Sequence, residues 1–261
     1  MTGLLEHLEA RRRAGRKLLV PYLVAGLPDP PGCGAALQAL ADHADALEVG
    51  LPYSDPLMDG PLIAAAAERA LAAGVGPRAG LAAGAVVTPV PRLVMTYYNP
   101  ILRAGEQAFC RAAAEAGYAG LIVPDLPLEE GEELRRAAAE EGLAWVPLVA
   151  PTSPPQRVEA LCRAATGFVY AVSTLGVTGE RAELSARAAA VVAAVRAVTD
   201  LPVLVGLGVS TPEQAVQACA AADGVVVGSA VVRALTEGGV AAAQALVAEL
   251  RAALDGAFAP A

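Results

Sequence analysis

The sequence predicts a closed (β/α)8 barrel, and three observations support this fold class. Eight short apolar segments recur along the chain at intervals of roughly 20 to 45 residues. None of them alternates cleanly between apolar and polar residues, which is typical of parallel strands that are covered on both faces. Ala-rich helical stretches lie between them, and a chain of 261 residues has the length of one such barrel.

Each expected strand is rich in Val, Leu, Ile or Tyr and is followed by a loop or a helical stretch. In order, the strands are Leu18–Val24, Ala46–Val49, Arg92–Tyr97, Gly120–Val123, Ala144–Val149, Gly167–Val172, Pro202–Val205 and Gly224–Val227. The clearest helices are Glu106–Ala116, Leu128–Glu141, Gln156–Ala165, Ala186–Thr199 and Pro212–Ala222. An extra N-terminal helix, at about Leu4–Arg13, is expected to close the bottom of the barrel. Because no linker or change of composition divides the chain, we expect residues 1–261 to form a single domain.

An open, doubly wound sheet is the alternative architecture. Such sheets usually carry a GxGxxG dinucleotide-binding loop after the first strand. The corresponding stretch here, AGLPDPPGCG, lacks that motif, and Gly206-Leu207-Gly208 is only a GxG. The closed barrel is therefore the better prediction.

Composition and charge exclude several classes of protein. Apolar residues make up 55% of the chain, which excludes a disordered protein. The formal net charge is −8, and the longest basic run is Arg11-Arg12-Arg13, so we expect no nucleic-acid partner. No signal-peptide core is present and the apolar runs are shorter than a membrane span, which predicts a cytoplasmic protein without a membrane partner.

Cysteine and histidine usage argues against a metal centre. The four cysteines, Cys33, Cys110, Cys162 and Cys219, are far apart and form no CxxC pair. They are expected to be small buried side chains in a reducing compartment. With only His7 and His43 in addition, we predict no metal site in this chain.

The carboxyl ends of the predicted strands, where such barrels place their active sites, carry a distinctive set of polar residues. Glu48 lies inside an apolar strand, where an ionised carboxylate is costly unless it is solvated or paired. It is either a structural carboxylate with polar partners or a group that titrates near neutral pH and transfers protons. Asp55 and Asp59 follow in a Pro-rich loop, where aspartates are turn formers or catalytic groups.

A phosphate site is predicted after the last two strands. Gly208 precedes Ser210-Thr211-Pro212-Glu213-Gln214, which has the pattern of a capped helix start, and Gly228-Ser229 opens another helix. Two adjacent helix N-termini with glycines for close approach can bind an anion without Lys or Arg. The alternative is that these glycines serve only tight turns.

Two further features belong to the sixth expected strand, Gly167–Val172, and to the loop after it. Tyr170 lies within the strand and is either a core aromatic residue or a residue that lines a site. The stretch Gly176-Val177-Thr178-Gly179 has glycines at both ends, which is typical of a lid loop. We expect this loop, about Thr174 to Leu184, to be mobile without ligand.

The stretch Leu47–Pro61, LEVGLPYSDPLMDGP, resembles the signature of the tryptophan synthase alpha subunit family. It combines a strand carboxylate, a Pro-bounded turn and an Asp-Gly pair at fixed spacing. The similarity continues along the chain through Pro21-Tyr22, Met95–Pro100, Pro124–Pro127, Ala150–Thr152, Gly176–Gly179, Gly206–Gly208 and Gly228-Ser229.

This resemblance implies a retro-aldol cleavage of indole-3-glycerol phosphate to indole and glyceraldehyde 3-phosphate. It assigns Glu48 as the general acid/base and places Asp59 opposite the indole N–H. The remaining positions that match the family's site are substrate-binding Tyr170, Tyr22, Met95, Ile122, Thr178 and Leu207, and phosphate-binding Gly179, Gly208, Gly228 and Ser229.

The resemblance also implies a partner, the tryptophan synthase beta subunit, in an alpha-beta-beta-alpha heterotetramer under allosteric control. Asp55 and the loop around Thr178 are the expected points of contact and response. Pyridoxal phosphate is expected only in that partner, so this chain would carry no cofactor. Two departures from the family pattern are Val24, where Thr is common, and the stretch from Leu62 to Pro91, which is short and rich in Ala and Gly.

Three other functions remain open on the sequence alone. The same site would serve a stand-alone lyase that releases free indole. A catalytically silent regulatory subunit is a second possibility, although the presence of both Glu48 and Asp59 argues against it. A phosphate-sugar isomerase on this fold is the third, and it leaves the apolar pocket unexplained.

Overall fold

The computed structural model describes residues 3–86, 88–172, 181–206 and 208–259. Its strands are all parallel and form one sheet in the order β5-β4-β3-β2-β1-β9-β8-β7-β6. They are β1 (Leu18–Val24), β2 (Leu47–Gly50), β3 (Arg92–Met95), β4 (Gly120–Ile122), β5 (Ala144–Trp145), β6 (Leu148–Val149), β7 (Val169–Val172), β8 (Val203–Gly206) and β9 (Gly224–Val227).

The sheet closes into a barrel through the segment Ala144–Val149. We predicted one strand here, but the structure divides it into β5 and β6 around Val146 and Pro147. Pro147 has no N–H to contribute to a ladder, although its carbonyl still accepts from the Tyr170 amide at 3.0 Å, and the Val146 amide donates to Leu121 at 3.1 Å. The first half of the segment is therefore hydrogen-bonded to β4, and the second half is hydrogen-bonded to β7. The segment thus joins the two edges of the sheet, and the predicted eight-segment barrel is confirmed.

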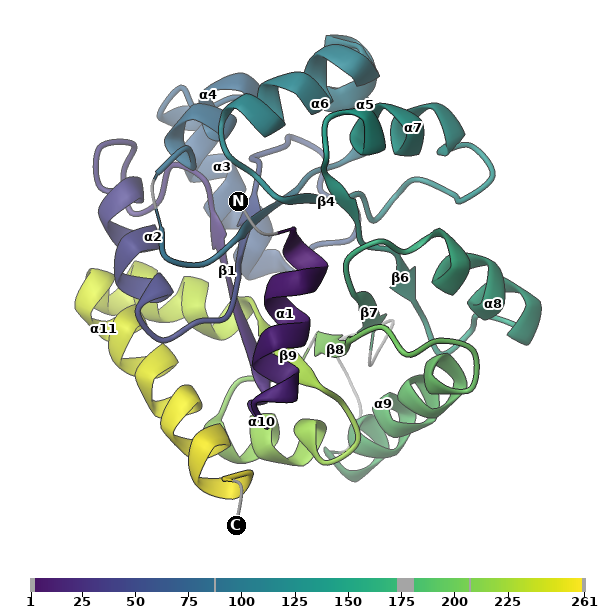
Figure 1. The fold of residues 1–261 in the computed structure, drawn as a ribbon. Coiled ribbons are helices and arrows are strands. Elements are labelled where there is room, and N and C mark those ends of the chain that lie inside the picture. Colours follow the sequence, from purple (N-terminus) through teal and green to yellow (C-terminus); the bar gives the residue numbers. More distant parts are fainter. Residues whose placement is uncertain (1–2, 87, 173–180, 207, 260–261) are drawn as a thin grey trace.

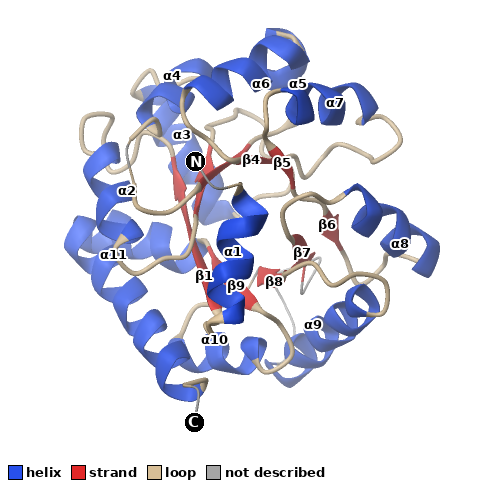
Figure 2. Cartoon of the chain, in the orientation of Figure 1, coloured by secondary structure: helices blue, strands red, loops and turns tan. Residues whose placement is uncertain are grey.

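Helices surround this ring of strands (Figures 1 and 2). They are α2 (Cys33–Ala41), α3 (Pro61–Ala72), α4 (Pro77–Ala83), α5 (Tyr98–Ala104), α6 (Glu106–Glu115), α7 (Glu132–Glu140), α8 (Pro155–Ala164), α9 (Arg181–Arg196), α10 (Pro212–Cys219) and α11 (Ser229–Ala257). The predicted helices are present with small shifts at their ends. The largest shift is at α9, which begins at Arg181 and not at Ala186. The start of α7 is at Glu132 and not at Leu128, because residues 128–130 form a turn.

Apolar side chains fill the inside of the barrel as well as the layer between strands and helices. Alternate residues along a strand divide between these two regions, as Leu18 and Val20 face inward while Leu19 and Leu23 face the outer helices. All four cysteines are free and buried, as predicted. The fully buried strands thus explain why no clean polar alternation is visible in the sequence.

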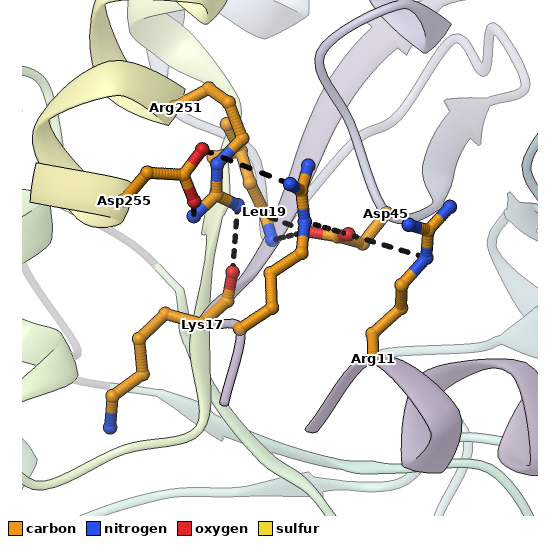
Figure 3. A network of polar contacts seen from close by, with 7 residues as sticks. Arg11, Lys17, Leu19, Asp45, Arg251 and Asp255 are labelled. Carbon is orange, nitrogen blue, oxygen red and sulfur yellow. Dashed lines mark hydrogen bonds and ion pairs between the residues drawn. The ribbon is translucent and has the colours of Figure 1, made fainter. Parts of the chain in front are cut away.

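The bottom of the barrel is closed by α1 (Leu4–Arg13), which lies across the strands in Figure 1. Its side chains Leu4 and Leu8 join the inner apolar cluster. Asp45, which is 0% exposed just before β2, binds the guanidinium groups of Arg16 at 2.7 Å and Arg251 at 3.2 Å (Figure 3). Because this end is filled by a helix and an ion-pair network, any site inside the barrel must open at the carboxyl ends of the strands.

The Ala- and Gly-rich stretch before β3 forms two short helices, α3 and α4. The buried guanidinium of Arg92 holds this region by donating to the carbonyls of Gly84, at the end of α4, and of Gly117, after α6. This stretch therefore belongs to the outer layer of the barrel, and Arg92 ties it to β3.

The last helix, α11, is long and apolar enough to cross a membrane by length and composition alone. Its backbone leaves the helical conformation at Gly239, where φ is +73°. Side chains on both sides of that break, such as Val231 and Leu250, are buried in the core. In this fold α11 is an outer helix of the barrel.

Candidate active site

Glu48 projects into the barrel near the carboxyl end of β2. Its neighbours Leu47 and Val49 point into the outer apolar cluster, so the strand alternation turns Glu48 inward. The side chain is 2% exposed, and its Oε2 atom has no hydrogen-bond partner among the described residues. Burial, followed by the charge of Asp59, raises the pKa of Glu48 from its ordinary value of 4.5 to about 8. At neutral pH this carboxyl group therefore holds a proton that it can donate.

Asp59 lies in the turn that connects β2 to α3. The turn is closed by hydrogen bonds within the loop, including the Asp59 amide to the Pro56 carbonyl at 3.0 Å, and Gly60 and Pro61 then start the helix. Burial raises the pKa of Asp59 to about 6, while a hydrogen bond from the Tyr97 hydroxyl lowers it. The pKa values of Glu48 and Asp59 are thus separated, so near pH 7 one carboxyl is protonated and the other is ionised.

Tyr97 is a site residue that the sequence analysis missed. Its hydroxyl donates to Asp59 Oδ2 at 3.1 Å and accepts from the Met58 amide at 3.0 Å. The stretch Met95–Pro100 is part of the family resemblance, but the expected strand Arg92–Tyr97 ends on Tyr97 and assigns it no role in the site. The structure ends β3 at Met95 and uses Tyr97 as the first flanking residue of α5. A tyrosine two positions after the end of a barrel strand was the available signal.

Tyr22 and Tyr170 flank Glu48 and are both buried. Tyr22 is paired with Glu48 in the β1–β2 register, and Tyr170 lies on β7. Burial raises the pKa of both hydroxyl groups well above the ordinary value, and the charges of Glu48 and Asp59 add to the effect. Both tyrosines therefore remain neutral and can act as hydrogen-bond donors.

Glycines on the neighbouring strands make room for these two rings. A Cβ atom at Gly50 would lie 2.1 Å from the Tyr22 hydroxyl, and one at Gly206 would lie 2.2 Å from the Tyr170 hydroxyl. Any larger residue at either position would displace a ring from the barrel mouth. The two glycines are therefore part of what shapes the site.

Two of the residues predicted for the apolar wall lie at the ends of neighbouring strands. Ile122 ends β4 with 1% exposure, and Met95 ends β3 half-buried, in contact with the inner cluster. Val24 is buried at the end of β1 and is paired with Gly50. Leu207, Thr178 and Gly179 lie outside the described residues, as does the lid loop around them.

A cavity of about 290 Å³ opens beside this wall. Its lining includes Val123, Pro124, Asp125, Leu126, Trp145, Leu148 and Arg157. Leu148 is paired with Tyr170 in the β6–β7 register, so the cavity borders the site from the side of β4 and β6. Neither Glu48 nor Asp59 lines this cavity.

The predicted phosphate positions lie at two neighbouring helix starts. β8 and β9 are adjacent strands, so the N-termini of α10 and α11 lie at the same end of the barrel. Gly208 has a φ of +93°, a conformation that favours glycine. The helix α10 starts with the predicted cap, in which the Thr211 hydroxyl accepts from the Gln214 amide and the Gln214 side chain accepts from the Thr211 amide.

The start of α11 is the better anion site of the two. Its flanking residue Gly228 provides no side-chain cap, so the amides of the first turn, which begins at the exposed Ser229, have no capping side chain as a partner. At α10 the Gln214 side chain already accepts from the amides of Ser210 and Thr211. No Lys or Arg occurs in residues 206–232, so a bound phosphate there would rely on amides and helix dipoles.

Asp55 is exposed in the loop after β2. Leu57 and Met58, next to it, are 79% and 50% exposed. Leu102 on α5 is 58% exposed, and the Asn99 side chain of the same helix donates to the Tyr53 hydroxyl at 3.0 Å, which ties α5 to this loop. The mouth of the site is therefore bordered by exposed apolar side chains.

Within the described part of the chain, no three His, Cys, Asp or Glu side chains gather as a metal site would need.

Comparisons with known proteins identify the family. The family model for the tryptophan synthase alpha chain matches residues 8–257. The tryptophan synthase alpha chain of Gloeobacter violaceus is 50% identical over 87% of this chain and 83% of the relative. That of a Picosynechococcus species is 46% identical over 99% of this chain and 100% of the relative.

Solved structures agree with the sequence comparisons. A structure of Mycobacterium tuberculosis tryptophan synthase superposes with a TM-score of 0.89 and 48% identity, covering 95% of this chain and 96% of the other. The tryptophan synthase alpha subunit of Legionella pneumophila superposes with a TM-score of 0.87 and 34% identity, covering 96% and 97%. The chain belongs to the tryptophan synthase alpha chain family, a family of enzymes of tryptophan biosynthesis.

Proposed function

We propose that this chain cleaves indole-3-glycerol phosphate to indole and glyceraldehyde 3-phosphate by a retro-aldol reaction. The observation that carries the proposal is the pair of carboxyls at the barrel mouth, Glu48 buried and Asp59 half-buried, with the pKa of Glu48 raised to about 8 and that of Asp59 to about 6. A reaction that moves a proton while charge develops on an aromatic ring needs one protonated and one ionised acid.

In the proposed mechanism Glu48 moves one proton between two atoms of the substrate. Its carboxylic acid protonates indole C3, which activates the bond from C3 to the glycerol side chain. The resulting carboxylate accepts the proton of the adjacent side-chain hydroxyl as that bond breaks. The electron pair of the broken bond returns to the ring, the hydroxyl carbon becomes an aldehyde, and Glu48 is protonated again.

Asp59 would stabilise the charge that this step creates. Protonation at C3 places positive charge on the ring nitrogen, so a carboxylate facing the N–H binds the intermediate more strongly than the substrate. Tyr22 and Tyr170, both neutral donors, would orient Glu48, and Met95 and Ile122 would contact the indole. By the family resemblance, Leu207 would contribute to the pocket, Thr178 to the lid and Gly179 to the phosphate site.

The substrate phosphate would be held at the start of α11, with Gly208 and Gly228 giving the backbone close access. This assignment follows from the uncapped first turn and the absence of basic residues in that stretch of sequence. It also explains how a chain with a net charge of −8 could bind an anion, because the attraction is local.

The partner we propose is the beta subunit of tryptophan synthase, in an alpha-beta-beta-alpha heterotetramer with allosteric coupling in the cytoplasm. The family's description as an alpha chain supports this assignment, and Leu57, Met58 and Leu102 provide an exposed apolar surface near Asp55. Pyridoxal phosphate would belong to that partner. A pyridoxal phosphate site needs a lysine, and the one lysine in the sequence is Lys17. Its ammonium group donates to the Ala222 carbonyl at the closed end of the barrel, the end opposite Glu48 and Asp59.

The test is a product assay on the purified chain with indole-3-glycerol phosphate. Indole and glyceraldehyde 3-phosphate should form in equal amounts, and the rate should rise when a tryptophan synthase beta subunit co-purifies with the chain. Release of indole without any association would support the stand-alone lyase instead. Failure to form either product, with or without the beta subunit, would refute the proposed reaction.

A further inference from the structure

The hydroxyl group of Tyr97 connects the loop after β2 to the end of β3. It lies 3.1 Å from Asp59 Oδ2 and 3.0 Å from the Met58 amide nitrogen. An amide N–H can only donate, so the hydroxyl oxygen must accept from Met58. The single hydroxyl proton is then directed to Asp59, which fixes the direction of that hydrogen bond.

The tyrosine ring is held on a rigid support. It is 3% exposed and packs against the Tyr53 ring with centroids 5.2 Å apart. The start of α5 beside it is fixed by Asp125, whose side chain accepts from the Tyr98 amide at 2.9 Å. The hydroxyl group therefore has one position relative to the strand ends, whereas Asp59 sits on a turn.

For Asp59 this contact sets which carboxylate oxygen is free. Among the residues that the structure describes, Tyr97 is the side chain that hydrogen-bonds to Asp59. With Oδ2 engaged, Oδ1 remains for a donor on the substrate. A hydrogen bond to the carboxylate also favours its ionised form, which is the form that a ring N–H requires.

We infer that Tyr97 is a positioning residue, whose hydroxyl holds Asp59 and the Met58 amide together so that Asp59 Oδ1 faces the ring N–H of the substrate. The inference rests on the proposed function of Asp59 and extends it by naming the group through which the loop is aligned. The other described titratable groups whose charges couple to Asp59 are Glu48, Tyr22 and Tyr170, so Tyr97 is the group that acts on it by direct hydrogen bonding.

The substitution Tyr97→Phe keeps the ring, its burial and its stacking and removes only the hydroxyl. In steady-state cleavage of indole-3-glycerol phosphate we expect kcat to fall about 10- to 100-fold, with KM within about threefold of wild type, since a hydrogen bond to an ionised group is lost. The acid limb of the kcat profile should move to higher pH, because burial of Asp59 is no longer opposed. The matched control is Tyr98→Phe, which removes a hydroxyl bonded to Glu106 and should leave kcat and the pH profile unchanged.

A second readout does not depend on activity. Carbon-13 NMR of the Asp59 carboxyl should show a higher titration midpoint in Tyr97→Phe than in wild type or Tyr98→Phe. In the wild-type protein alone, the Tyr97 Cζ resonance should shift with the same midpoint as Asp59, which keeps the test valid if the variant does not fold. If the wild-type chain is active, and Tyr97→Phe has the same kcat and the same Asp59 titration midpoint as wild type, the inference is overturned. A wild-type chain without cleavage activity would refute the proposed function, and the NMR titrations would still decide the contact.

Discussion

Replacing Glu48 by Gln should remove a loss of stability that grows with pH, so the stability of the variant relative to wild type should rise with pH. The pKa of the carboxyl is raised from 4.5 to about 8 in the folded state, so folding binds a proton at intermediate pH. Because the folded-state pKa is raised, the contribution of Glu48 to folding stability is fully present below pH 4.5, the pKa of the unfolded chain. It is lost as the pH rises toward 8, the pKa in the folded protein. The linkage slope of about 1.4 kcal/mol per pH unit, applied between 4.5 and 7, predicts a loss of up to about 3 kcal/mol at pH 7.

Gln has the same shape and does not titrate, so the difference in unfolding free energy between Glu48→Gln and wild type should rise by that amount between pH 4.5 and 7. For a chain of this size about 3 kcal/mol corresponds to a gain of about 6 to 12 °C in Tm. The amide's need for hydrogen-bond partners adds an offset that is the same at every pH, and the slope is therefore the quantity to measure.

The assay is chemical denaturation of both proteins at pH 5, 6, 7 and 8, with Glu249→Gln on the exposed surface of α11 as the matched control. The control should differ from wild type by less than about 0.5 kcal/mol at each pH. A stability difference between Glu48→Gln and wild type that does not change from pH 5 to pH 8 would mean that Glu48 is ionised at neutral pH, and the reasoning would be refuted.

Three further predictions follow from the site and the fold. Asp59→Asn should lower kcat about 10²- to 10³-fold with little change in KM, because the carboxylate acts on charge that develops during the reaction; a change in KM alone in steady-state assays would contradict this role. Gly228→Ala places a Cβ atom at ordinary contact distance, 3.6 Å, from Ile63 and Tyr22, so the protein should fold normally while KM for the phosphate substrate rises about tenfold, equal to ~1.4 kcal/mol; unchanged KM would remove α11 from the phosphate site. Asp45→Ala leaves the buried Arg251 without its buried partner and should cost about 3 to 5 kcal/mol in urea denaturation, whereas a loss below about 1 kcal/mol would show that the network at the barrel bottom is dispensable.

Much of the fold could be predicted from the sequence because buried parallel strands and Ala-rich helices have strong local signatures. The division of Ala144–Val149 into β5 and β6 was not foreseen, since it depends on which neighbour each half of the segment bonds around Pro147. The late start of α7 at Glu132 has a similar origin, because the apolar Leu128 was assigned to the helix although it belongs to a turn.

The site was predictable to the extent that its residues are unusual in their local setting. Glu48 stood out as a charge within an apolar strand, and the cap at Thr211 has a direct sequence pattern. Tyr97 was missed because its importance lies in a contact with Asp59, 38 positions away in the chain. A contact between residues so far apart in the chain has no local sequence pattern, and it is the closed barrel that brings the two side chains together. The roles of Thr178, Gly179 and Leu207 remain predictions from the resemblance.

The most direct test of the central claim is the rate of indole release by Glu48→Gln compared with the wild-type chain, each saturated with indole-3-glycerol phosphate. An acid/base that moves a proton between the side-chain hydroxyl and C3 has no substitute in Gln, so the rate should fall by about 10²- to 10⁴-fold or more, while the variant still binds the substrate. Indole release by Glu48→Gln within a few-fold of wild type would contradict the account, because the proton would then move through another group.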